Sequence, residues 1–112
     1  MKFNINYNKG IKFLRPETKE LGLFKKDRLE ENFIFDNCSY KTLAIDLNSV
    51  ISIDSSILGL FIRYSDVLKN NNKKLVLFGI SEYLSGVFRL TMIDCIIPIL
   101  ESKQDVIDKF GQ

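Results

Sequence analysis

The sequence contains no histidine among its 112 residues. Histidine supplies the imidazole that activates serine and cysteine nucleophiles, and it is the commonest metal ligand. Its absence excludes Ser-His and Cys-His catalytic pairs, an imidazole general base, and metal sites that contain histidine. Most familiar hydrolytic mechanisms are therefore excluded.

Cysteine is nearly as scarce, since the chain has only Cys38 and Cys95. Two cysteines this far apart in sequence match neither a zinc-binding pattern nor a redox dithiol motif. Free cysteine is among the most buried residue types in folded proteins. We therefore expect two reduced thiols that belong to the core, and we expect neither a metal site nor a cofactor.

A long apolar run and a cluster of basic residues are also missing. No segment approaches the ~20 apolar residues that span a bilayer, and the N-terminal residues lack the continuous apolar core of a signal peptide. Sixteen basic and fourteen acidic residues give a net charge of +2, and the basic residues are scattered. We therefore expect a cytoplasmic protein that neither inserts into a membrane nor binds nucleic acid.

The start of the chain has the pattern of a β-hairpin. Apolar and polar residues alternate over residues 3–8, and Lys9-Gly10 then supplies a turn into a second apolar segment, residues 11–14. Pro16 cannot donate a hydrogen bond to a central ladder and restrains the residue before it. We therefore expect the second strand to end there and a loop to begin at Arg15.

Two nearly unbroken apolar runs, residues 43–47 and 75–78, are typical of parallel strands that are covered on both faces. Between them, an amphipathic segment from about Ser55 to Asn70 is long enough for the helix that connects two parallel strands. Further elements are expected as follows: helices over residues 24–35, from Ser81 onward and from Ser102 to Phe110, and an edge strand over residues 96–100.

The composition is that of an ordinary globular domain, with 46% hydrophobic and 27% charged residues. A chain of this length has room for one core of ordinary size. The sequence therefore predicts a single α/β domain over residues 1–112. Its expected architecture is a small, mostly parallel sheet with an N-terminal hairpin and with helices packed on it.

The start of the long central helix is the most informative part of the chain. In an α/β protein, the junction after a parallel strand and before its helix is the usual place for a functional site. Here this junction carries Asp54, Ser55 and Ser56. By position alone, Asp54 or Ser55 is the N-cap of the helix, a role worth ~1 kcal/mol. We expect both serine hydroxyls to be exposed.

A projection of this helix at about 100° per residue separates an apolar face from a solvent-facing line. The residues of the face expected to lie on the sheet are Ile57, Leu60, Phe61, Tyr64, Val67 and Leu68. Leu58 and Ile62 fall on neither this face nor the solvent-facing line, which includes Gly59. They either pack against the helix that begins at Ser81 or form an exposed apolar strip beside the serines, which would be half of a partner-binding surface.

These motifs resemble a known family. Asp54-Ser55-Ser56 followed by Leu58-Gly59, after a strand that ends at Ile45-Asp46-Leu47, resembles the signature of STAS domains, in particular of bacterial anti-sigma-factor antagonists. The later stretch from Leu90 to Asp94 is also similar to that family. The resemblance covers roughly residues 42–107, and the fold that it implies agrees with the α/β domain predicted from the residues.

The resemblance also implies a function. In antagonists of this type, the serine directly after the motif aspartate is phosphorylated by a partner that is both anti-sigma factor and serine kinase. That serine corresponds to Ser55, with Ser56 as the second choice. The unphosphorylated form binds the anti-sigma factor, and a PP2C-type phosphatase restores this form. The implied partner-binding residues are Asp54, Ser55, Ser56, Leu58, Gly59 and Ile62.

Two other functions stay open. The first is a STAS regulatory module that does not use a kinase, such as a subunit of a membrane transporter or a small-ligand sensor. The second is an enzyme, because Asp46, Asp54 and Asp94 could supply carboxylates. None of the three has an obvious base or metal partner in the sequence, so we expect the protein not to be an enzyme.

Overall fold

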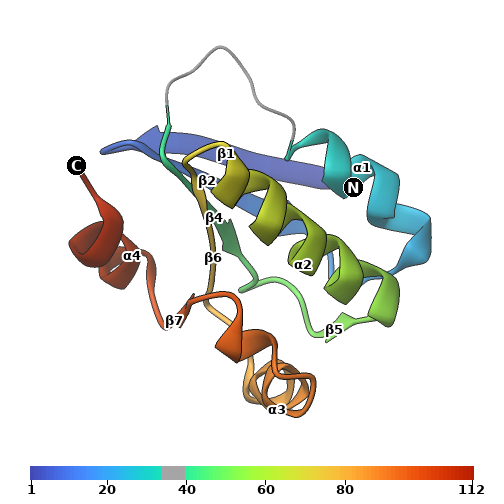
Figure 1. The fold of residues 1–112 in the computed structure, drawn as a ribbon. Helices are drawn as coiled ribbons and strands as arrows, with labels where there is room; N and C mark the ends of the chain where they lie inside the picture. The colour runs from blue at the N-terminus through green and yellow to red at the C-terminus, as the bar shows by residue number, and fades with distance from the viewer. Residues whose placement is uncertain (34–39) are drawn as a thin grey trace.

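The fold is built on a five-stranded sheet in the order β1-β2-β4-β6-β7 (Figure 1). This arrangement comes from a computed structural model, which describes residues 1–33 and 40–112. β1 runs antiparallel to β2, whereas the neighbouring pairs from β2 to β7 are parallel. The strands are β1 (Lys2–Asn8), β2 (Ile11–Glu17), β4 (Thr42–Asp46), β6 (Lys74–Phe78) and β7 (Ile99–Leu100). The predicted α/β class, with a hairpin and a mostly parallel sheet, is confirmed.

A second, much smaller sheet lies directly before the longest helix. It pairs β3 (Glu20–Leu21) in parallel with β5 (Ser52–Ile53). This pairing brings two segments that are about thirty residues apart in sequence to the same place, directly before the longest helix. The helical segments are η1 (Leu23–Lys25), α1 (Lys26–Glu31), α2 (Ser55–Asn70), α3 (Glu82–Leu90), η2 (Ile93–Cys95) and α4 (Lys103–Phe110).

The central strands place alternate side chains on the two faces of the sheet. Leu43 and Ile45 of β4 join the larger buried cluster, which contains the inner residues of α2. Ala44, between them, joins a smaller cluster with Val106 of α4. Figure 1 accordingly shows α2 and α4 on opposite sides of the sheet. The nearly unbroken apolar runs in the sequence are explained by this double coverage.

The central helix follows the projection closely. α2 begins at Ser55 and ends at Asn70, as the sequence predicts, and Ile57, Leu60 and Phe61 are buried against the core. No helix in the described part of the chain is both long and apolar enough to cross a membrane.

The loop expected from Arg15 is wrong, because β2 continues through Pro16 to Glu17. The parallel pairing of β2 with β4 covers only Ile11–Leu14, so Pro16 lies beyond the central ladder and opposite Phe3 of the edge strand β1. Proline is tolerated at the edge of a sheet, where a missing N–H leaves no central acceptor unpaired.

The helix expected over residues 24–35 is shorter than predicted. A 3-10 turn precedes α1, which ends at Glu31, and the side-chain amide of Asn32 donates to the carbonyl of Arg28 at 2.9 Å. Such side-chain bonds to the backbone favour the end of a helix. The predicted helix end at residue 35 and the predicted exit loop over residues 36–39 both fall within residues 34–39, which lie outside the described residues.

The expectation of two core cysteines is wrong for Cys95, which is exposed. It is the last residue of η2, and the residue that this short turn buries is Ile93. Side chains two residues apart on a helical turn point in different directions, so burial of Ile93 turns the Cys95 thiol outward. Cys38 lies outside the described residues.

Candidate functional site

Asp54 is the N-cap of α2. Its Oδ1 accepts hydrogen bonds from the backbone N–H of Ser56 at 3.0 Å and of Ile57 at 3.3 Å, and from the Ser56 hydroxyl. The first N–H groups of a helix have no partner within the helix, and an aspartate before the first turn is a preferred acceptor for them. Of the two predicted caps, the structure thus selects Asp54 over Ser55.

The second oxygen of the same carboxylate connects α2 to a distant segment. Asp54 Oδ2 accepts the backbone N–H of Leu23 at 2.9 Å, across 31 positions of sequence. Gly22 lies against this oxygen, and a Cβ at that position would come within 2.9 Å of it. The Asp54 N–H also donates to the carbonyl of Leu21 at 3.1 Å. The segment before α1 is therefore held against the start of α2.

The hydrogen bonds to Asp54 lower the pKa of its carboxyl group below the usual value for aspartate. The largest cause is the Ser56 hydroxyl, and the backbone N–H groups of Leu23, Ile57 and Ser56 act in the same direction. Donors that bond to a carboxylate favour its charged form. A full negative charge therefore lies next to Ser55 at neutral pH.

The two serines of the motif differ in what surrounds their hydroxyls. Ser55, the first residue of α2, is exposed, and its hydroxyl forms no hydrogen bond with another described residue. Ser56 is half-buried, and its hydroxyl donates to Asp54. The expectation that both hydroxyls are exposed therefore holds fully for Ser55 alone. Of the two serines, Ser55 is therefore the more accessible from solvent.

The remaining predicted surface residues lie further along α2. Gly59 is exposed, and a Cβ built there meets no atom within 4 Å. Ile62 is 41% exposed, whereas Leu58 is partly buried and packs against the main core. Of the two interpretations offered for Leu58 and Ile62, packing therefore applies to Leu58 and exposure to Ile62. Ile62 leaves an apolar side chain open to solvent on the same helix as Ser55, and Leu58 is mainly a packing residue.

Sequence reasoning missed an apolar group that the Leu23 hydrogen bond places beside the motif. Phe24 is 100% exposed and Leu23 is 61% exposed. Phe24 and Asp54 both line a pocket of about 300 Å³. The sequence indicated that residues 23 and 24 are apolar, but their position beside Asp54 depends on the pairing of β3 with β5. No local pattern could have revealed this contact.

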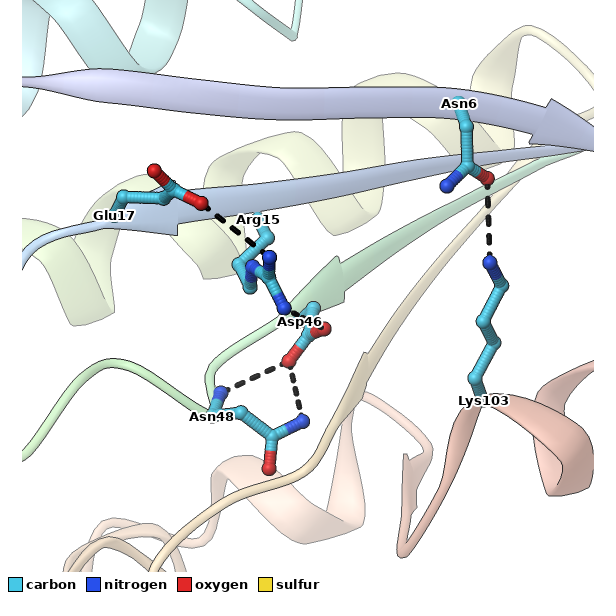
Figure 2. A network of polar contacts seen from close by, with 6 residues as sticks. All are labelled: Asn6, Arg15, Glu17, Asp46, Asn48 and Lys103. Carbon is cyan, nitrogen blue, oxygen red and sulfur yellow. Dashed lines mark hydrogen bonds and ion pairs between the residues drawn. The ribbon is translucent and has the colours of Figure 1, made fainter.

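The carboxylate of Asp46, at the end of β4, lies in a separate polar network (Figure 2). Its Oδ1 accepts the backbone N–H of Asn48 at 2.9 Å and the side-chain amide of Asn48 at 2.6 Å, and Arg15 lies 4.0 Å from Oδ2. Figure 2 shows Arg15 also reaching Glu17, and Lys103 of α4 reaching Asn6 across the face of the sheet. Asp46 therefore stabilises the turn after the strand.

Asp94 and Asp54, the other two carboxylates considered for catalysis, belong to different elements from Asp46. Asp94 is an exposed residue of η2, and Asp54 is the helix cap described above. Within residues 1–33 and 40–112, no group of three or more acidic or cysteine side chains could hold a metal ion. What the region around α2 offers instead is an accessible hydroxyl, an adjacent fixed charge and exposed apolar side chains, which suit binding and modification.

Known proteins resemble this chain at three levels. The STAS domain family model matches residues 8–106. Two relatives, anti-sigma-B factor antagonists of Listeria monocytogenes and Listeria innocua, are each 40% identical over 57 residues. This match covers 51% of the chain and 50% of each relative, so the chain matches about half the length of these relatives.

Solved structures share the fold at low sequence identity. A candidate anti-sigma factor antagonist from Thermotoga maritima has a TM-score of 0.86 at 22% identity, with 96% of this chain and 92% of that chain covered. The unphosphorylated form of the anti-sigma factor antagonist SpoIIAA has a TM-score of 0.77 at 15% identity, with 96% and 95% covered. A sulfate transporter family protein from Wolinella succinogenes has a TM-score of 0.76 at 16% identity, with 89% and 84% covered. Because the family model matches nearly the whole chain, the protein belongs to the STAS domain family.

Proposed function

We propose that this protein is an anti-sigma factor antagonist whose binding to its partner is ended by phosphorylation of Ser55. The partner is an anti-sigma factor that also has serine kinase activity, and a PP2C-type phosphatase reverses the modification. The observation that carries the proposal is the exposed hydroxyl of Ser55 at the start of α2, which bonds to no other described residue and lies next to the ionised carboxylate of Asp54. The named function of the two Listeria relatives supports it.

The position of Ser55 allows a phosphate to be added without loss of the fold. A phosphoserine carries roughly −1.5 to −2 charges at neutral pH. The N-terminus of a helix carries a partial positive charge, which stabilises a nearby anion by ~0.3–1 kcal/mol. The side chain points to solvent, so the phosphate stays hydrated in the free protein.

The same phosphate is unfavourable inside an interface. Removing a dianion from water costs several kcal/mol unless the partner supplies matching cations. The neighbouring Asp54 adds a further negative charge that cannot move away, because its two oxygens are bonded to Leu23, Ser56 and Ile57. Partner binding is therefore lost well before the domain is destabilised.

The surface that binds the partner in this proposal extends in two directions from Ser55. Along α2 it includes Gly59 and Ile62, which are four and seven residues further on and share one side of the helix. Across from the helix start it includes Phe24, which is fully exposed. Aromatic side chains at the centre of an interface often carry much of the binding energy, so Phe24 is the expected anchor.

The decisive test compares two substitutions that add the same charge. Ser55→Asp should weaken binding to the anti-sigma factor at least about 100-fold in calorimetry, which corresponds to ~2.7 kcal/mol. Ser102→Asp adds the same charge at the N-cap of α4, on the other face of the sheet, and should leave binding within about twofold. Both proteins should stay within about 1 kcal/mol of the parent in stability. Equal binding by Ser55→Asp and the parent would remove the switch.

The modification itself is tested by mass spectrometry. After incubation with the purified anti-sigma factor and ATP, the peptide that contains Ser55 should gain one phosphate, and Ser55→Ala should not. A phosphatase of the PP2C class should remove the phosphate and restore binding. If Ser55→Ala is fully active in cells and no phosphate appears, the protein is a STAS module that acts without a kinase.

A further inference from the structure

A second cavity lies at the C-terminal end of α2, the end opposite Ser55. It has a volume of about 570 Å³ and lies between the last turn of α2, the start of β6, the end of α4 and the segment between η2 and β7. Pockets that bind small molecules typically have volumes of about 300–1,000 Å³. Because α2 has 16 residues, this cavity is about 24 Å along the helix axis from the serine motif.

Among residues 1–33 and 40–112, four lysines and no acidic residue line this cavity; the lysines are Lys69, Lys73, Lys74 and Lys109. Two of them share one aromatic ring, since the Nζ atoms of Lys74 and Lys109 lie 5.4 and 5.8 Å from the ring centroid of Phe110. Attraction between an ammonium group and the face of an aromatic ring holds both cations there. Lys73 contacts Tyr40 instead: its ammonium donates to the Tyr40 carbonyl and lies 4.1 Å from the centroid of the Tyr40 ring.

A purely structural role accounts for only part of this charge. Lys69 lies in the last turn of α2 and Lys109 in the last turn of α4, where cations complement the helix dipoles. Each helix end contributes about −0.5 charge, so the two ends offset roughly one of the three positive charges of Lys69, Lys74 and Lys109. Lys69, Lys74 and Lys109 form no ion pair with a described carboxylate; Asp66 and Asp105, one turn before Lys69 and Lys109, do not line the cavity.

The other lining residues are mostly apolar, with Ser65 and Asn72 as the polar exceptions. The apolar ones are Leu75, Ile96, Pro98 and Phe110, and Ile96 is 52% exposed. A concave surface with charges of one sign and low-dielectric walls concentrates the electrostatic potential and attracts ions of the opposite sign. Lysine is a common ligand of phosphate groups. The geometry points to a binding site for a phosphate-bearing molecule with an apolar portion, in which the lysines hold the phosphate and the apolar wall holds the remainder.

Such a ligand has two possible sources, a soluble phosphate compound or the headgroup of an anionic lipid. Two probes separate them. In the first arm, inorganic pyrophosphate is titrated into the labelled full-length protein, and amide shifts are followed by NMR. In the second arm, the protein is sedimented with vesicles of phosphatidylcholine that contain phosphatidic acid, and with vesicles of phosphatidylcholine alone. Sodium chloride at matched ionic strength controls for general screening of charge.

The test uses two double variants that lose the same charge. Lys69→Ala with Lys109→Ala removes two exposed cavity lysines, and Lys2→Ala with Lys19→Ala removes two exposed lysines that do not line the cavity. We expect the cavity variant to weaken binding of the probe at least about tenfold and the control variant to change it less than twofold. Thermal melting verifies that both variants fold.

The outcomes assign the source or overturn the site. Amide shifts at the cavity residues with pyrophosphate, lost in the cavity variant, identify a soluble phosphate ligand. If the protein sediments only with vesicles that contain phosphatidic acid, and the cavity variant does not, the ligand is a lipid headgroup. If neither probe binds in a manner that depends on Lys69 and Lys109, or if the control variant loses binding equally, the proposed site does not exist. None of these results depends on Ser55 or on an anti-sigma factor.

Discussion

The two ends of α2 differ in the sign of their charged side chains and in how those side chains are bonded. At the N-terminal end, the single carboxylate of Asp54 is bonded to backbone N–H groups of two segments and to one hydroxyl. At the C-terminal end, several ammonium groups gather around a cavity, and Lys69, Lys74 and Lys109 have no carboxylate partner among the described residues. The helix dipole favours both arrangements, since it attracts anions to its start and cations to its end.

This difference separates charge that stabilises the fold from charge that remains available to a ligand. Both oxygens of Asp54 accept hydrogen bonds, so this carboxylate fixes the positions of Ser56 and Leu23. Lys69, Lys74 and Lys109 carry more positive charge than the helix ends offset, so in our proposal their charge acts on a bound molecule. The helix dipole favours the charge at both ends, but we expect only the charge of Asp54 to contribute much to the stability of the fold. Four measurements test this difference.

The largest expected change in stability comes from Asp54→Ala. The substitution removes the N-cap of α2, worth ~1 kcal/mol, and the bond to the Leu23 N–H, worth about another 1 kcal/mol. Urea denaturation should therefore show a loss of about 2 kcal/mol. Ser102→Ala removes a cap with a single backbone bond, to the Asp105 N–H, and should cost about half as much. Equal losses would mean that Asp54 does not connect two segments.

Acid pH should weaken the contacts that two carboxylates, Asp54 and Glu30, make with donors of α2. The pKa of Asp54 is lowered in the folded protein, mainly by the Ser56 hydroxyl, and that of Glu30 is lowered, mainly by the Tyr64 hydroxyl. A lowered pKa stabilises the fold above the pKa of the unfolded chain, and this contribution is lost as pH falls below about 4. Asp54→Asn keeps a good cap without a titratable group. Its unfolding free energy should therefore fall less steeply than that of the parent between about pH 5 and pH 2.5.

The middle of α2 offers a test in which stability and binding move in opposite directions. Gly59→Ala should raise the unfolding free energy by about 0.5–1 kcal/mol, because alanine favours the helix and the added methyl meets no neighbour. Gly86→Ala in α3 has the same open surroundings and should give a similar gain. Only the change at Gly59 should weaken binding to the anti-sigma factor. Weakened binding by both, or by neither, would remove Gly59 from the proposed surface.

The smallest effect is expected from Lys69→Ala in the absence of any phosphate ligand. Loss of a cation from the last turn of α2 is unfavourable by ~0.3–1 kcal/mol, but relief of repulsion from the other cavity lysines opposes it. The net change in urea denaturation should be under about 0.5 kcal/mol. A loss of more than about 1 kcal/mol in unfolding free energy would show that this lysine stabilises the fold, which would argue against a role limited to ligand binding.

Sequence reasoning succeeded where the pattern is local. The bounds of α2 follow from the cap at its start, its apolar spacing and the asparagines at its end, and the central strands follow from their apolar runs. The resemblance to STAS domains rests on the same local motifs, and the family match confirms it. Position within a helix also sufficed to identify Ile57 as a core residue.

The sequence could not predict contacts between segments that are far apart. The bond from the Leu23 N–H to Asp54 spans 31 positions, and that from the Tyr64 hydroxyl to Glu30 spans 34. Each depends on a polar side chain with many possible partners in the unfolded chain. The strand through Pro16 was missed for a related reason, because tolerance of a proline depends on which neighbouring strand has already ended.

The segment from Gly22 to Asn32 is fastened by a carboxylate at each end. Asp54 holds the Leu23 N–H at its beginning, and near its end Glu30 accepts from Arg63 at 2.7 Å and from the Tyr64 hydroxyl at 2.8 Å. A helix as short as α1 does not persist without tertiary contacts. In native-state hydrogen exchange, residues 22–32 should therefore open as one unit, and this opening should need less free energy than opening of the sheet. When the segment opens, Phe24 moves away from α2.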